Sequence, residues 1–231
     1  MSLAFPALEP VTLPIAGTDK RFPLHRIYCV GRNYAEHAVE MGFTGREPPF
    51  FFLKPANAVV PVEAGATGSI AYPPLTKNLH HEIELVVAIG TGGKNILAAD
   101  AHKHIFGYAV GLDMTRRDLQ NEMKKQGRPW SIGKAFDQSA PIGPITPVAA
   151  AGDVANAEIY VQVNGADRQR SNVAKLIWNI GETIEHLSAA WELQPGDLIY
   201  TGTPEGVAAV VAGDTLVGGV GGLGTLTVKI A

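Results

Sequence analysis

Apolar and polar residues alternate along this chain mostly with the two-residue period of β-strands. The apolar runs are short, and glycine, proline, asparagine or aspartate stands at their ends, a pattern typical of strands joined by turns. The segment from Val11 to Gly31, interrupted by a turn with Gly17 and Asp19, indicates a hairpin that enters the core. Further strands are predicted within residues 49–55, 69–74, 81–90, 105–113, 157–165, 197–203 and 225–230.

Helical signals are fewer, and each of them is short. Asn33 can cap a helix over residues 34–41, with Glu36 reaching back to the cap and Gly42 ending the helix. The other predicted helices cover residues 98–104, 115–127 and 179–191.

Composition narrows the class of protein further. The chain of 231 residues has 46% hydrophobic residues, enough for a sizeable core, which excludes disorder as its main state. Its 22 acidic and 19 basic residues give a formal charge of −3, and only 18% of positions are charged, where about 25% is usual. A nucleic-acid partner is therefore not expected. With 26 glycines and 16 prolines, many turns should join many strands.

The sequence also indicates where the protein works. No uninterrupted apolar stretch approaches the roughly 18 residues that a membrane span needs. The N-terminus has no basic region followed by a long apolar stretch. The single cysteine, Cys29, stands in an apolar run and is interpreted as a small buried hydrophobe. We therefore expect a cytoplasmic protein that is not bound to a membrane.

Carboxylates mark the first candidate site. Glu82 and Glu84 lie two apart on a predicted strand and so share one face, while Ile83 and its alternate neighbours make the other face apolar. Two like charges a few Å apart repel by about 4 kcal/mol at an effective dielectric of about 20, a cost that a divalent cation offsets. Asp113 ends a second apolar run, and three oxygen ligands suit magnesium, manganese or calcium. The alternative is a solvated strand end without an ion.

Histidine side chains supply a second candidate. His37 and Glu40 lie three apart on the predicted helix 34–41, so the carboxylate can orient the imidazole and raise its basicity. The alternative is an ordinary polar helix surface. His102 and His104 stand in a polar stretch and are expected at a solvated surface.

Two glycine-containing turns have different interpretations. In YTGTPEG, residues 200–206, a strand leads into a turn at Thr203 where backbone N–H groups can approach a ligand, although a plain turn is the alternative. The string GVGGLG, residues 219–224, matches a dinucleotide-binding fingerprint. Only seven residues follow it, too few for the helix and second strand of that unit, so the match is rejected.

Several motifs occur together and in order, and together they resemble the fumarylacetoacetate hydrolase family from Arg26 to the C-terminus. They are GRNYAEHAVEMG, FFLKP, HEIELVVAIG, GYAVGLDMTRRDLQ, KKQGRPWSIGKAFD and IYTGTPEGV. Within the family the chain is similar to the smaller single-domain acylpyruvate hydrolases. The resemblance implies an α+β fold, a β-rich roll of the mixed β-sandwich type with few short helices. It also implies one catalytic domain over residues 1–231, with an N-terminal hairpin extension over 1–25, and a homodimer.

The same resemblance assigns roles to individual residues. It implies Mg²⁺ or Mn²⁺, with Ca²⁺ as a substitute in crystals, held by Glu82, Glu84 and Asp113. The implied catalytic residues are His37, Glu40 and Lys134. The implied substrate-binding residues are Lys54, Arg117, Gln120 and Thr203. Because three carboxylates and one dication leave a charge of −1, an anionic substrate needs further cations, and Lys54, Arg117 and Lys134 are the candidates.

The implied reaction is metal-dependent hydrolysis of a carbon–carbon bond in a small anionic keto acid. By resemblance the substrate is an acylpyruvate, and fumarylpyruvate would give fumarate and pyruvate. Decarboxylation of oxaloacetate or isomerisation of a related keto acid is an alternative on the same fold. A non-catalytic metal-dependent binding protein is a second alternative, against which the presence of His37 and Lys134 argues.

Overall fold

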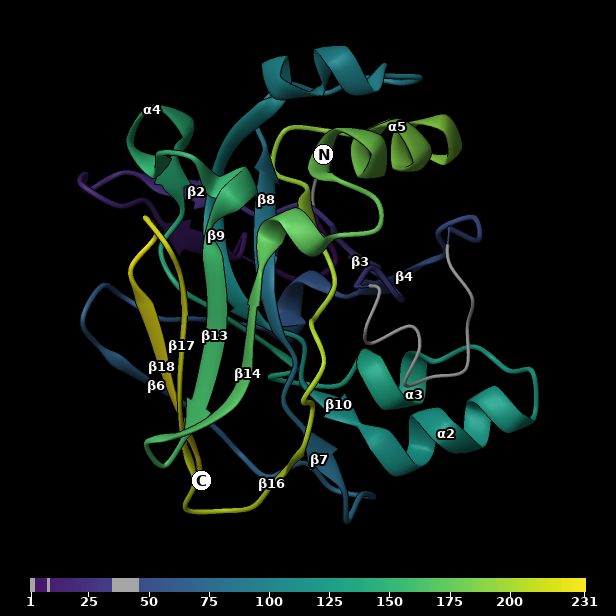
Figure 1. Ribbon diagram of the computed structural model, residues 1–231, viewed down its shortest axis with the longest axis vertical. Coiled ribbons are helices and arrows are strands. Elements are labelled where there is room, and N and C mark those ends of the chain that lie inside the picture. Colours follow the sequence, from purple (N-terminus) through teal and green to yellow (C-terminus); the bar gives the residue numbers. More distant parts are fainter. Residues whose placement is uncertain (1–2, 8, 35–45) are drawn as a thin grey trace.

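The computed structural model describes residues 3–7, 9–34 and 46–231. Its framework is a sheet of eight strands, which curls in space (Figure 1). Its neighbouring strands are antiparallel except for the pairs β15–β3 and β11–β5, which are parallel. In order across the sheet they are β4 (Phe51–Lys54), β3 (Ile27–Val30), β15 (Leu198–Tyr200), β8 (Ile83–Ile89), β9 (Ile105–Leu112), β11 (Ala140–Ile142) and β5 (Val59–Pro61), with β12 (Thr146–Pro147) also paired to β9.

A second sheet of five strands packs against the first (Figure 1). Between them lies a core to which β8 contributes Ile83 and Leu85 and the second sheet contributes Val161, Leu216 and Val228. The strands of this sheet, in order, are β14 (Ala166–Asn172), β13 (Glu158–Val163), β17 (Thr215–Val220), β18 (Thr225–Ile230) and β6 (Thr67–Ile70). The expected β-rich sandwich with few short helices is confirmed.

Short elements complete the architecture around these sheets. A small sheet joins β10 (Thr115–Arg116), β7 (Leu79–His80) and β16 (Ala209–Val210). Among the described residues, the α-helices are α2 (Arg117–Lys125), α3 (Ser131–Lys134), α4 (Val148–Ala151) and α5 (Ile180–Ala190). The 3₁₀ helices are η1 (Ala56–Ala58), η2 (Ala98–Lys103), η3 (Val154–Asn156) and η4 (Val173–Lys175).

The central strand β8 is buried on both faces along its whole length, as its sequence predicts. Leu85 faces the second sheet, whereas Val87 and Ile89 pack in a core with residues of α5 and η2. On the opposite face, Val86 and Ala88 lie in an inner core that also contains Cys29 and Tyr200. Glu84 precedes Val86 on that same face, so its carboxylate lies at the end of the inner core.

The N-terminal hairpin consists of β1 (Thr12–Pro14) and β2 (Arg21–Pro23), paired antiparallel as predicted. Leu13 and Phe22 are buried in the inner core, and the Phe22 ring packs on Phe106 at 5.3 Å between centroids. The hairpin therefore covers one side of the curled sheet.

Differences from the predicted elements lie at their ends. The strand expected within 69–74 is β6, which begins at Thr67 and ends at Ile70, because prolines at 73 and 74 follow it. Asn179 caps α5 in a capping box with Glu182, and the helix ends before Trp191, whose ring packs on Tyr28. The GVGGLG string ends β17 and turns into β18 with no helix after it, which agrees with its rejection as a dinucleotide site.

The helix predicted over 34–41 falls almost entirely outside the described residues. Its expected cap, Asn33, is described and buried, and its side chain contacts other segments. The Asn33 amide donates to Trp178 O and Thr201 O, and its Oδ1 accepts from Trp178 N–H at 2.8 Å.

In the described part of the chain, no helix is long and apolar enough to cross a membrane.

Leu85→Ala should lower the free energy of unfolding by about 2–5 kcal/mol, because Leu85 is 0% exposed on the central strand and its removal leaves a cavity. The control Leu97→Ala, at a position that is 62% exposed, should change it by less than about 0.5 kcal/mol. Urea unfolding followed by circular dichroism measures both variants. Equal losses would contradict the described core.

Candidate functional site

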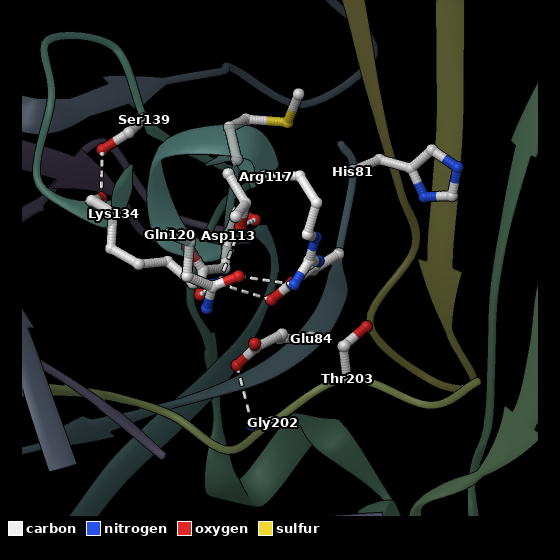
Figure 2. Close-up of polar contacts among 12 residues, drawn as sticks. His81, Glu84, Asp113, Arg117, Gln120, Lys134, Ser139, Gly202 and Thr203 are labelled. Atoms are coloured by element: carbon white, nitrogen blue, oxygen red, sulfur yellow. Dashed lines mark hydrogen bonds and ion pairs between the residues drawn. The ribbon is translucent and has the colours of Figure 1, made fainter. Parts of the chain in front are cut away.

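Three carboxylates meet where the beginning of β8 lies beside the end of β9 (Figure 2). The two strands are antiparallel with Ile83 opposite Leu112, and the Asp113 N–H donates to Glu82 O at 2.9 Å. Glu82, Glu84 and Asp113 are 5%, 1% and 1% exposed, and each offers one carboxylate oxygen within 4.8 Å of the others. The alternative of a solvated strand end is therefore wrong, and the carboxylates are buried together.

This donor set fits a hard divalent cation. Oxygen ligands lie about 2.0–2.1 Å from Mg²⁺ and about 2.3–2.6 Å from Ca²⁺, so two ligands on opposite sides of one ion are separated by about 4–5 Å. The three carboxylate oxygens lie within 4.8 Å of one another, a separation that one such ion can bridge. All three donors are carboxylates, which favour such ions over zinc.

Glu84 is the most strongly perturbed member of the three. Burial, followed by the negative charges of Asp113 and Glu82, raises the pKa of Glu84 well above its usual value. Lys134 and the Gly202 N–H, which donates to Glu84 Oε2 at 2.7 Å, act in the opposite direction. A dication at this position would favour the ionised form of the carboxyl group.

Lys134, the last residue of α3, places its ammonium group between two of the carboxylates (Figure 2). Its Nζ donates to Glu82 Oε2, Asp113 Oδ2 and Thr115 Oγ1, each at 2.7 Å. Burial alone would lower the pKa of Lys134, but the charges of Asp113 and Glu82 exceed that effect and raise it. Lys134 is thus held as a buried cation.

Lys54 and Arg117 contact the same carboxylates from other elements. Lys54 Nζ, from β4, lies 2.8 Å from Asp113 Oδ1 and also donates to the carbonyl of Lys134. Arg117, at the start of α2, forms an ion pair with Glu82 and donates to Gln120 Oε1 at 2.6 Å. The structure therefore brings Lys54, Arg117, Gln120 and Lys134 together around the carboxylates.

These contacts change the expected charge balance. The three cations form ion pairs with Glu82 and Asp113, and their formal charge equals that of the three carboxylates before any ion binds. A bound dication would bring the cluster to +2, in place of the −1 obtained when only the carboxylates are counted. The site therefore suits a ligand with more than one negative charge.

Thr203 lies close to the carboxylates in the turn after β15, but its hydroxyl group is already engaged. Its Oγ1 donates to Ile83 O at 2.8 Å and accepts from Gln169 Nε2 at 2.9 Å. The hydroxyl proton is therefore directed to the β8 backbone in this arrangement. A role for Thr203 toward a ligand, as predicted, would use its backbone or require the hydroxyl group to turn.

Two predicted residues, His37 and Glu40, lie outside the described residues. Three other residues singled out in the sequence also have described surroundings. Cys29 is fully buried, and burial raises its pKa. His102 and His104 each donate from Nδ1 to a neighbouring backbone carbonyl near the surface. The expectations for these three residues are confirmed.

Sequence reasoning missed two groups that contact the cluster. Thr115 receives a hydrogen bond from Lys134, and nothing in its local pattern indicates this. The Gly202 N–H contacts Glu84, and the glycine between two threonines was a signal for a close backbone approach. Gly202 has φ +102°, and a Cβ there would lie 2.7 Å from the Asn33 Cβ, so the turn requires glycine.

Comparison with known proteins gives a consistent result. The model of the family described as "Fumarylacetoacetate (FAA) hydrolase C-terminal" matches residues 26–231. The fumarylpyruvate hydrolase of Ralstonia sp is 49% identical over 184 residues, which are 80% of this chain and 93% of that protein. The human mitochondrial protein named oxaloacetate tautomerase FAHD1 is 40% identical over 205 residues, 88% of this chain and 90% of its own.

Solved structures resemble the whole chain. The crystal structure of fumarylpyruvate hydrolase from Pseudomonas aeruginosa in complex with Mn²⁺ and pyruvate has 57% sequence identity and a TM-score of 0.97. That similarity covers 100% of this chain and 99% of the other. A structure from Burkholderia cenocepacia, titled as a putative fumarylpyruvate hydrolase, has 46% identity and a TM-score of 0.92, covering 100% and 95%.

Glu84→Gln should stabilise the metal-free protein at neutral pH, because it removes a buried carboxylate whose ionisation the fold disfavours. The raised pKa means that the parent loses stability as pH rises above about 4.5, where the unfolded chain ionises, so the advantage of the variant should grow from pH 4 to pH 8. Thermal unfolding at these pH values measures it.

In the same unfolding experiment, Mn²⁺ should raise the Tm of the parent and leave that of Glu84→Gln nearly unchanged. Glu122→Gln, an exposed change on α2, serves as the control and should respond to Mn²⁺ like the parent. An equal Mn²⁺-induced rise in Glu84→Gln would show that this carboxylate is not a ligand.

Proposed function

This chain belongs to the fumarylacetoacetate (FAA) hydrolase C-terminal family, and from that premise we propose that it is a metal-dependent hydrolase of the carbon–carbon bond in an acylpyruvate. The proposed substrate is fumarylpyruvate, which gives fumarate and pyruvate. The observation that carries the proposal is a buried carboxylate triad in a chain 57% identical, over its full length, to a fumarylpyruvate hydrolase solved with Mn²⁺ and pyruvate.

Glu82, Glu84 and Asp113 would hold the Mg²⁺ or Mn²⁺ ion. When bound, such an ion supplies Lewis-acid polarisation of a keto oxygen and a positive charge beside a developing enolate. The charge balance supports the proposed substrate, because fumarylpyruvate carries two carboxylates and the cluster with a dication has a formal charge of +2.

Lys134, Arg117 and Lys54 are proposed to bind and orient the anionic substrate. Lys134 is proposed to stabilise the oxyanion through its positive charge, because its ammonium group is buried and held protonated, while its three N–H groups already donate to Glu82, Asp113 and Thr115. Arg117 can offer a planar fork to a substrate carboxylate, and Gln120 positions that guanidinium. The Thr203 turn would contribute to the same site.

His37, oriented by Glu40, is proposed as the general base. It would take a proton from a water molecule whose oxygen adds to the carbonyl carbon farther from the pyruvate carboxylate. The bond between that carbon and the pyruvyl methylene then breaks, and its electron pair becomes the pyruvate enolate. Protonation of the enolate by the imidazolium gives pyruvate, and the other fragment leaves with a new carboxyl group that releases its proton to solvent to give fumarate, so atoms and protons balance.

A second candidate function is the interconversion of keto-acid tautomers. The relative named oxaloacetate tautomerase is 40% identical over 88% of this chain, and enolate stabilisation is common to both reactions. Decarboxylation of oxaloacetate would use the same charges. A chain that binds Mn²⁺ and pyruvate but converts neither acylpyruvate nor oxaloacetate would be a binding protein.

The proposal extends to the setting of the enzyme. We place it in the cytoplasm as a homodimer, on the family resemblance and on the fully buried thiol of Cys29, the single cysteine of the chain. Light scattering after size exclusion tests the dimer.

With Mn²⁺ present, the protein should convert fumarylpyruvate to fumarate and pyruvate in equal amounts. EDTA should abolish this turnover and added Mn²⁺ restore it, because the carboxylates alone cannot polarise the substrate. Chromatographic product analysis makes the measurement, with oxaloacetate assayed in parallel. Turnover of oxaloacetate without any fumarate from fumarylpyruvate would favour the second candidate.

Lys134→Met should lower kcat by about 10²–10³-fold at saturating Mn²⁺, because it removes a buried cation from the position where negative charge develops. Lys125→Met changes an exposed lysine on α2 in the same way and should leave kcat unchanged. Steady-state kinetics on fumarylpyruvate compares them. Parental kcat in Lys134→Met would remove this lysine from the mechanism.

A further inference from the structure

A glutamine on the second sheet reaches the back of the carboxylate site. Of the seven residues of β14, Gln169 alone is buried, at 1% exposure, although its neighbours along the strand are polar and mostly exposed. A buried polar side chain in such a strand must find partners or destabilise the fold. The hydrogen-bond partners of Gln169 lie beside Glu82 and Glu84 and in the turn after β15.

All four hydrogen-bonding positions of the Gln169 side chain are filled. Its Oε1 accepts from the Ile83 N–H at 3.1 Å and lies 3.0 Å from His81 Nδ1. Its Nε2 donates to Thr203 Oγ1 at 2.9 Å and to Pro204 O at 2.7 Å. Because a backbone N–H can only donate and a carbonyl can only accept, the orientation of the amide is fixed by its partners.

This orientation also fixes the groups around it. His81 Nδ1 must carry the proton that it shares with Gln169 Oε1. The Thr203 hydroxyl accepts from Gln169 and so donates to Ile83 O at 2.8 Å. Figure 2 shows the His81 ring and the Thr203 hydroxyl on the side of the site that is remote from Lys134.

Both backbone polar groups of Ile83, the residue between Glu82 and Glu84, are therefore hydrogen-bonded within this network. Its N–H is held directly by Gln169, and its C=O is held through Thr203. The adjoining Gly202 N–H contacts Glu84 Oε2. The Gln169 side chain therefore holds the β8 backbone at Ile83, between the two glutamates. Through Thr203 it also holds the turn after β15, whose Gly202 N–H contacts Glu84.

We infer that Gln169 is a positioning residue of the metal centre, acting through Ile83 and Thr203 rather than by touching an ion or a substrate. This inference deepens the proposed function and rests on its assignment of Glu82, Glu84 and Asp113 as ligands. Groups that orient ligands in this way contribute about 10–100-fold to metal affinity or activity.

The test is the Mn²⁺ dissociation constant of the full chain, measured by electron paramagnetic resonance of free Mn²⁺ during titration. Gln169→Met keeps the length of the side chain and removes all four hydrogen bonds, and it should weaken Mn²⁺ binding by about 10–100-fold. Ser171→Ala is the matched control, because Ser171 lies two residues along the same strand with a buried Oγ that has no partner among the described residues. It should bind Mn²⁺ like the parent.

A second control separates positioning from general destabilisation. Val228→Ala removes buried volume from the second sheet at a residue that contacts the core and not the site. It should lower Tm but leave the Mn²⁺ dissociation constant unchanged. If a folded Gln169→Met binds Mn²⁺ like the parent, or if Val228→Ala weakens Mn²⁺ binding as much, the inference is wrong.

Gln169→Glu decides the question if the methionine variant does not fold. It keeps the acceptors for the Ile83 N–H and His81 and loses the donors to Thr203 and Pro204, so the turn is released while β8 stays held. Mn²⁺ binding should weaken measurably and by less than 100-fold. A folded Gln169→Glu with parental affinity would overturn the inference.

This readout is independent of the reaction. If the parent chain binds Mn²⁺ but does not hydrolyse fumarylpyruvate, the proposed activity fails and the inference about Gln169 is still tested by affinity alone. If the parent chain does not bind Mn²⁺, the ligand assignment and the inference about Gln169 fail together.

Discussion

Three carboxylates buried within 4.8 Å of one another are the arrangement on which the rest of this structure depends. Each pair would repel strongly in an interior that screens charge poorly, so the fold must surround them with positive charge. It does so with Lys54, Lys134 and Arg117, which come from three separate elements. The short helices α2 and α3 place Arg117 and Lys134 beside the carboxylates at the ends of β8 and β9.

This balance prepares the site for anions once a dication is present. Lys54 and Lys134 are buried and Arg117 is partly buried, and the carboxylates orient all three before a substrate binds. Preorganised charges of this kind need little rearrangement when negative charge develops on a bound molecule. The same residues therefore stabilise the fold and carry the proposed chemistry.

Sequence reasoning predicted the strands and the three carboxylates that the structure brings together, because both follow from local spacing. The alternation around Glu82 and Glu84 gives their shared face, and Asp113 ends the neighbouring apolar run. The pairing of Lys54 with Asp113 joins segments 59 residues apart, and no local pattern reveals it. Gln169 is harder still, because its strand has the composition of a solvated edge. The engaged hydroxyl of Thr203 depends on that same glutamine and could not be predicted without the structure.

The antiparallel pairing of β8 with β9 and β15 has a kinetic consequence. The groups that form the centre come from positions between Lys54 and Thr203, so they meet only after contacts of high sequence separation have closed. Such contacts form slowly, because loop-closure entropy opposes them until they are complete. Glu82, Glu84 and Asp113 lie at the facing ends of β8 and β9, whereas Gly202 contacts Glu84 from 118 residues further along the chain. The centre is complete only when this long-range contact has formed, so a bound ion would stabilise the finished fold, unlike a structural zinc that nucleates a domain.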